Sequence, residues 1–151
     1  MAPGTPITYA QICDAVKTTL APAITYVQSY NELTEGMADT PRLQVYPQSG
    51  SSNPPQQTDR TTFQAVVRQQ EITVYADLYA SPRNEIGEDM AILLPLLDAV
   101  VTELEKQDTK PYFGLTGLKG WNWRWDRATF QYNDPLQLYV GARFIFTFRV
   151  F

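Results

Sequence analysis

The last sixteen residues alternate between apolar and polar side chains. Every second position is apolar: Leu136, Leu138, Val140, Ala142, Phe144, Phe146, Phe148 and Val150. A period of two is typical of a β-strand with one buried face. At about 3.3 Å per residue the run would extend roughly 50 Å, far longer than an ordinary strand. We therefore predict a long terminal strand whose apolar face forms the floor of the core.

A second stretch with this period covers residues 61–80 and is clearest from Glu71 onward. It predicts another long strand. The pattern is irregular before position 71, so we expect a bend or bulge near Gln69, with the earlier half projecting as a hairpin arm.

Shorter apolar runs predict strands at residues 24–30 and 43–46, the latter ended by Pro47. Residues 31–41 read as a polar connection. Residues 48–59 hold turn formers, amides and two prolines, so they predict an exposed loop.

Two segments have helical spacing. Thr8 and Gln11 stand at the spacing of a capping box, and the apolar residues that follow predict a helix from Tyr9 to about Ala21. A longer helix is expected after Asn84, with acidic residues in its first turn. One apolar face should comprise Ile86, Met90, Leu93, Leu94, Leu97, Val100, Val101 and Leu104. Pro95 lies inside this helix and should kink or divide it.

Three tryptophans, Trp121, Trp123 and Trp125, share one phase of a further predicted strand. Three later apolar residues, Ala128, Phe130 and Tyr132, have the opposite phase. We expect a bulge at residues 126–127 that returns all six to one side, facing the terminal phenylalanines. We interpret the tryptophans as a core or subunit-interface stripe, with a platform for a sugar or base as the alternative.

These elements predict a single domain over residues 1–151. The expected fold class is α+β: one mainly antiparallel twisted sheet with a long C-terminal hairpin, packed against two helices.

The composition excludes most common chemistries. The formal net charge is −4, which argues against a nucleic-acid binder. The chain has no histidine and a single cysteine, Cys13, which we expect to be a packed core side chain. We expect no catalysis, metal or cofactor: Lys119 lacks the flanking residues of a phosphate loop, and the acidic clusters read as a helix start and a solvated face. No leader pattern or long apolar run is present, so we expect neither secretion nor a membrane span.

One sheet face is richer in aromatic and arginine residues than a solvated face requires. This composition predicts a subunit or partner interface. The candidate residues, with the tryptophan stripe, are Tyr75, Asp77, Tyr79, Trp121, Trp123, Trp125, Tyr139, Arg143 and Arg149.

The element order, the segment DRTTFQAVVRQQEITVYADLYAS with its following helix, and the terminal LYVGARFIFTFRV strand after a tryptophan-rich one resemble the tail terminator proteins of long-tailed bacteriophages. The likeness spans residues 7–150. It implies a virion protein, made in the host cytoplasm, that forms a homohexameric ring. Such a ring caps the tail tube, ends its polymerisation and joins the tail to the head.

The resemblance also implies partners: the tail tube protein and a head-closure or neck protein, with DNA passing through unbound and no membrane. Neighbouring neck components, such as head-closure or connector subunits, have similar sizes and remain an alternative. A monomeric binding module that uses the tryptophan stripe is a further one.

Overall fold

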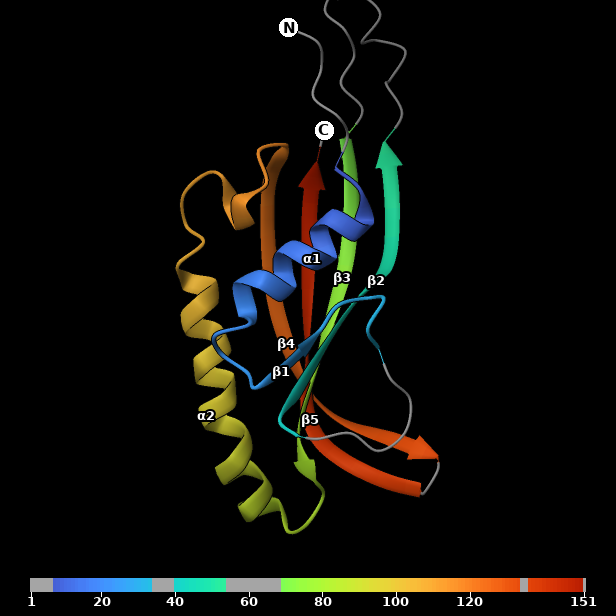
Figure 1. Cartoon of the computed structure of the whole chain (residues 1–151), viewed down its shortest axis with the longest axis vertical. Coiled ribbons are helices and arrows are strands. Elements are labelled where there is room, and N and C mark those ends of the chain that lie inside the picture. The colour runs from blue at the N-terminus through green and yellow to red at the C-terminus, as the bar shows by residue number, and fades with distance from the viewer. Residues whose placement is uncertain (1–6, 34–39, 54–68, 134–135, 151) are drawn as a thin grey trace, which may run out of the picture.

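The computed structural model describes residues 7–33, 40–53, 69–133 and 136–150. Two α-helices cover one face of a five-stranded sheet, so the predicted α+β class is confirmed (Figure 1). The helices are α1 (Tyr9–Leu20) and α2 (Ile86–Glu105), and a short 3-10 helix, η2 (Tyr112–Gly114), precedes β4. In spatial order the strands are β1 (Tyr26–Gln28), β2 (Arg42–Asn53), β3 (Gln69–Pro82), β5 (Leu136–Val150) and β4 (Leu118–Asn133). The β1–β2 pair is parallel and the others are antiparallel.

The predicted terminal strand is β5, which lies between β3 and β4. Its apolar face is buried from Val140 to Val150, and the rings of Phe144, Phe146 and Phe148 have no exposed surface. Leu138 departs from the prediction and is exposed, because it lies toward the hairpin end, where the sheet curves away from both helices (Figure 1).

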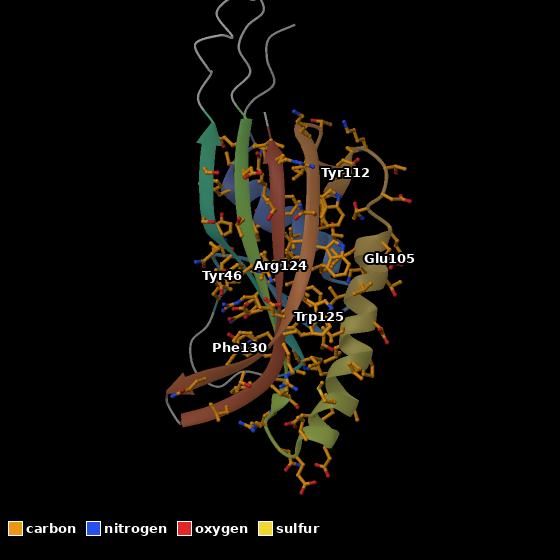
Figure 2. The ribbon with its side chains drawn as sticks, turned by 180° about the vertical axis from the view of Figure 1, so that it is seen from behind. Tyr46, Glu105, Tyr112, Arg124, Trp125 and Phe130 are labelled. Carbon is orange, nitrogen blue, oxygen red and sulfur yellow. The ribbon has the colours of Figure 1, made fainter. Side chains whose placement is uncertain are left out.

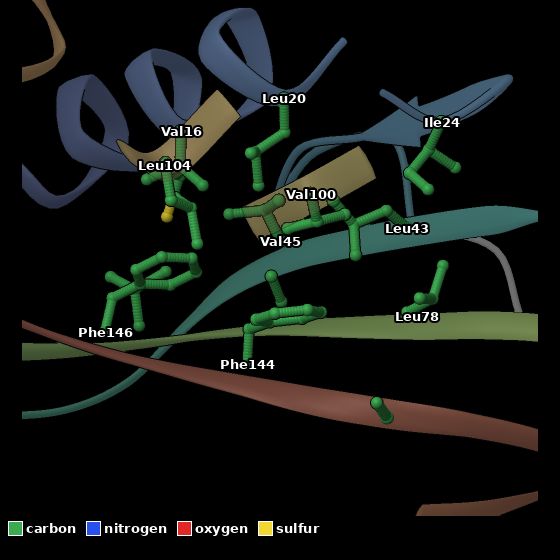
Figure 3. Packing of buried hydrophobic residues seen from close by; sticks show 14 of the residues in the cluster. Val16, Leu20, Ile24, Leu43, Val45, Leu78, Val100, Leu104, Phe144 and Phe146 are labelled. Atoms are coloured by element: carbon green, nitrogen blue, oxygen red, sulfur yellow. The ribbon is translucent and has the colours of Figure 1, made fainter. Parts of the chain in front are cut away.

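The core lies between this face and the helices (Figure 3). Phe144 and Phe146 pack in one cluster with Val16 and Leu20 of α1 and Val100 of α2. Each Phe side chain of this size contributes roughly 1.5–3 kcal/mol when it is fully buried. The floor predicted from the alternation is therefore the surface on which both helices rest.

The capping box of α1 is confirmed. The Gln11 N–H donates to Thr8 Oγ1 at 3.1 Å, and the Thr8 N–H donates to Gln11 Oε1 at 2.9 Å. These two bonds satisfy donors that a helix start leaves unpaired. Cys13 lies on the buried side of α1, as expected.

The second helix settles one of the two predicted effects of Pro95 and differs from its prediction in the composition of the buried face. It continues through Pro95 as one helix, so it is not divided there. Pro95 and Ala91, whose carbonyl loses its partner, are both exposed, so water can hydrate that carbonyl. Ile86 and Leu94 do not belong to the buried face: they are 68% and 49% exposed.

Strand β2 is longer than predicted, because Pro47 does not end it. The register with β3 shifts between Pro47 and Ser49 and then continues to Asn53. Since β1 pairs only with residues 42–44, β2 is an edge strand at Pro47, where a missing N–H is tolerated. Residues 48–53 of the predicted loop are therefore strand, although the side chains of 48–51 are exposed as expected. Residues 54–59 lie outside the described residues.

The bulges lie elsewhere than predicted. The irregularity of β3 against β5 falls between Tyr79 and Ser81, not near Gln69, and the predicted arm at 61–68 lies outside the described residues. The pairing of β4 with β5 is continuous at Asp126 opposite Arg143, so the predicted bulge at 126–127 was wrong. The change of phase instead reflects a change in which face of β4 is covered. Before Asp126 the apolar residues lie on the helix side, as Trp121 and Trp123 do. After Asp126 they lie on the back face, as Phe130 does.

Gly141 is a position where backbones approach too closely for a side chain. A Cβ there would lie 1.8 Å from the Leu78 carbonyl oxygen, whereas a Cβ at Gly87 in α2 would meet nothing within 4 Å. We predict that Gly141→Ala lowers the free energy of unfolding by about 2–3 kcal/mol. Gly87→Ala should raise it by about 0.5–1 kcal/mol. Urea denaturation of both variants checks this, and a neutral Gly141→Ala would contradict the close approach.

Candidate interaction surfaces

No described helix covers the face of the sheet opposite α1 and α2. Figure 2 shows this back face, with Tyr46, Arg124 and Phe130 on it. Antiparallel sheets often leave one face to water, but such a face is normally polar. Here Tyr46, Tyr75 and Ile145 are half-buried and Arg149 is exposed. The back face therefore stays a candidate interface.

A hydrogen-bonded network occupies the middle of the back face. The Asp77 carboxylate accepts from the Tyr46 hydroxyl at 2.6 Å and from Arg143 Nε at 2.8 Å. The Arg143 guanidinium also lies 4.5 Å from the centre of the Tyr75 ring. The hydrogen bond to Asp77 raises the pKa of Arg143 above its ordinary value. Burial, followed by the bond to Asp77, raises the pKa of Tyr46.

The β4–β5 hairpin end closes over the lower part of the back face. Tyr79 and Tyr139 are buried in a second small cluster with Phe130, whose ring centre lies 4.5 Å from that of Tyr79. The guanidinium of Arg42 lies 5.1 Å from the Tyr79 ring centre. These contacts account for much of the aromatic and arginine content that suggested an interface.

The predicted interface residues of the back face therefore differ in how far they are buried. Asp77, Tyr79 and Tyr139 are buried by other residues of the same chain. Tyr75 and Arg143 are half-buried, and Arg149 is exposed. The sequence analysis missed Tyr46 and Arg42, which the register places opposite Tyr75 and Tyr79. Only the pairing of β2 with β3 identifies them, because the sequence does not show which strand lies beside β3.

The tryptophans lie on the helix side of the sheet, opposite the phenylalanines, as predicted. Trp121 is held by its Nε1–H, which donates to the Gln107 carbonyl at 3.2 Å, and by the Phe113 ring at 4.7 Å. Trp123 packs on Phe144. Trp125 is 39% exposed, so only the end of the stripe faces outward.

Helix α2 is the second element with exposed apolar residues. Ile86, Ile92 and Leu94 are 68%, 46% and 49% exposed. With 3.6 residues per turn, Ile92 and Leu94 lie on opposite flanks of the buried stripe that contains Leu93. Residues 85–108 contain seven acidic side chains, of which Asp89 is buried, and Lys106 is their only basic one.

The third surface is the outer edge of β4, which pairs with no strand in the described part of the chain. An open pocket of about 520 Å³ lies along this edge. Residues 119–123 of β4 line it, together with Arg149 of β5 and with Gln107, Asp108 and Tyr112 from the segment between α2 and β4.

Two further observations concern reactive groups. Among the described residues, no three potential metal-ligating side chains of the His, Cys, Asp or Glu type gather into one site. Burial, with a contribution from Asp14, raises the pKa of the Cys13 thiol to about 11, so the reactive thiolate is disfavoured. Neither described helix is long and apolar enough to span a bilayer.

No protein-family model matches the chain, and a search of curated proteins finds no match.

Removing the carboxylate at the centre of the back-face network tests its contribution to stability. We predict that Asp77→Ala lowers the free energy of unfolding by about 2 kcal/mol, because the partly buried Arg143 and the Tyr46 hydroxyl lose their shared partner. Asp98→Ala removes an exposed carboxylate from α2 and should change stability by less than about 0.5 kcal/mol. Denaturant titration compares the two. Equal effects would mean that the network adds no stability.

Proposed function

We propose that this chain is a structural, non-enzymatic subunit of a virus particle. In this proposal, copies assemble into a hexameric ring that caps the tail tube, ends tail polymerisation and joins the tail to the neck of the head. The tail tube protein and a head-closure protein are the expected partners. DNA passes through the ring without specific binding.

One observation carries the proposal. The two layers of the molecule each leave apolar side chains accessible: Ile92 and Leu94 are exposed on opposite flanks of α2, and Tyr75 and Ile145 are half-buried on the back face. Two different patches on opposite sides of a subunit permit a head-to-tail contact, and such heterologous contacts generate rings when the rotation closes. A self-complementary dimer would need only one patch.

Charge is compatible with the same arrangement. Helix α2 is rich in acidic residues, whereas the back face carries both signs: Arg124 is paired with Asp126 at 2.7 Å, and Arg149 lies opposite Glu71. A face of mixed charge meets an acidic helix with less repulsion than a second acidic helix would. The net charge of −4 also suits a channel through which DNA must slide, because attraction would slow its passage.

Substitution of Leu94 tests the contact directly. Leu94→Arg places a charge on the exposed apolar side of α2 and should weaken self-association at least about tenfold while leaving the fold intact. Leu33→Arg is a matched control, since Leu33 is also exposed but lies in the β1–β2 connection. Size-exclusion chromatography with light scattering measures the assemblies. A wild-type chain that stays monomeric at every concentration and is absent from purified particles would contradict the proposal.

Inactivating the gene in the virus that encodes the chain distinguishes a terminator from another neck component. Without a terminator, tube polymerisation has no stop, so electron microscopy should show tails of uncontrolled length. Loss of a head-closure or connector subunit should instead give tails of normal length that are not joined to heads. Normal, joined tails would exclude both roles.

A further inference from the structure

The pocket at the start of β4 has no role in the proposed ring contact. Its volume is about 520 Å³. Small-molecule sites in proteins range from about 300 to 1,000 Å³, so this pocket is large enough for one. It lies where the register of β4 with β5 shifts, between Leu118 and Gly120.

One wall of the pocket is aromatic. Trp121 and Trp123 contribute from the helix side of β4, and Tyr112 contributes from the segment before it. All three side chains are half-buried, so each keeps part of its surface accessible. Aromatic surface of this kind packs well against the apolar C–H groups of a ligand.

This wall is held in place before any ligand arrives. Phe113 has a φ of 54°, in the left-handed region that is strained for a residue with a side chain. Its N–H donates to Gln107 Oε1 at 2.9 Å, and its ring packs edge-on against Trp121. The Gln107 carbonyl accepts from Trp121 Nε1–H at 3.2 Å. Gln107 thus fixes both rings, which reduces the entropy lost when a ligand binds.

The polar groups of the pocket include both donors and acceptors. Asp108 supplies a carboxylate, Asn122 an amide and Arg149 a guanidinium. All three are exposed, and none makes a hydrogen bond or ion pair with another described residue. Arg149 lies across Gly120, where an added Cβ would be 2.8 Å from its Nη2. The absence of a side chain at Gly120 therefore lets the guanidinium reach the pocket.

We propose that this pocket binds a neutral oligosaccharide. The apolar C–H faces of a sugar ring suit the two tryptophans, and its hydroxyl groups, which both donate and accept, suit Asp108, Asn122 and Arg149. A carboxylate and a guanidinium in one pocket favour an uncharged ligand, because a charged one meets a like charge there. Lys119, which already has an interaction partner, is given no role.

The row of tryptophans favours a chain of sugars over a single one. Trp125 lies on the same face of β4 as Trp121 and Trp123, just outside the pocket, and is 39% exposed. Alternate residues of a strand are about 7 Å apart, so the rings follow one another along β4. A saccharide that extends from the pocket along this face therefore reaches Trp125.

Single-stranded nucleic acid also stacks on aromatic rings, but its phosphates require a positively charged groove. Asp108 lies in this pocket and the net charge of the chain is −4. These charges favour the saccharide over the nucleic acid.

The test titrates the full chain with hexamers of glucose, mannose and N-acetylglucosamine, up to about 10 mM, and follows tryptophan fluorescence. We expect a saturable change with at least one of these hexamers. The corresponding monosaccharide should bind at least about fivefold more weakly, because it does not reach Trp125. A galacturonate hexamer and a thymidine oligonucleotide serve as the anionic comparisons.

Four substitutions connect binding to the pocket. Asp108→Ala and Asn122→Ala each remove an exposed polar group and should weaken binding of the hexamer at least about fivefold. Trp125→Ala should weaken binding of the hexamer but not of the monosaccharide. Trp123→Phe keeps an aromatic ring against Phe144 and should weaken binding of both.

The matched controls are Thr109→Ala and Thr129→Ala. Both residues are exposed and lie outside the pocket, one beside Asp108 and the other on β4. Binding should stay within about twofold of the unsubstituted chain.

Three results would overturn the proposal. These are no saturable change with any of the neutral saccharides, binding that Asp108→Ala and Asn122→Ala leave unchanged, and tighter binding of the galacturonate hexamer or the oligonucleotide. The test is independent of ring formation: a monomeric chain that binds saccharide would contradict the ring alone, and an assembled chain that binds none would contradict the saccharide site alone.

Discussion

The structure depends on the burial of one face of β5. Phe144, Phe146 and Phe148 have no exposed surface, and their rings follow one another at 6.4 and 5.9 Å between centres. Because β5 lies between β3 and β4, its register places both neighbours. Both helices then pack on the floor that these strands form, since neither can bury its apolar side on the other alone.

The strict alternation along β5 also determines which of its residues lie on the opposite face. If every even residue from 140 to 150 points to the helices, then Tyr139, Arg143 and Arg149 must point away from them. Where the hairpin end curves over this face, aromatic rings and Arg42 cover one another. Where the hairpin end does not cover this face, the Asp77 carboxylate accepts hydrogen bonds from Arg143 and Tyr46 and holds both side chains in place. The back face is thus ordered by the chain itself, and only its half-buried and exposed residues remain for another subunit.

The proposed head-to-tail contact joins the two layers of the molecule, α2 of one subunit and the back face of the next. The outer edge of β4 lies at the boundary of these layers and pairs with no strand in the described part of the chain. A ring built through the layers would therefore present a row of such edges.

The sequence by itself determined the elements whose pattern is local. The period of β5, the capping box of α1 and the burial of Cys13 follow from spacing and composition, which act within a few residues. The tertiary structure decided what depends on partners distant in sequence. Pro47 stays in β2 because the sheet has an edge there, and Leu94 is exposed because α1 and the sheet cover only one side of α2. Tyr79 and Tyr139 are buried because the hairpin curves over them, and no pattern along the chain encodes that curvature.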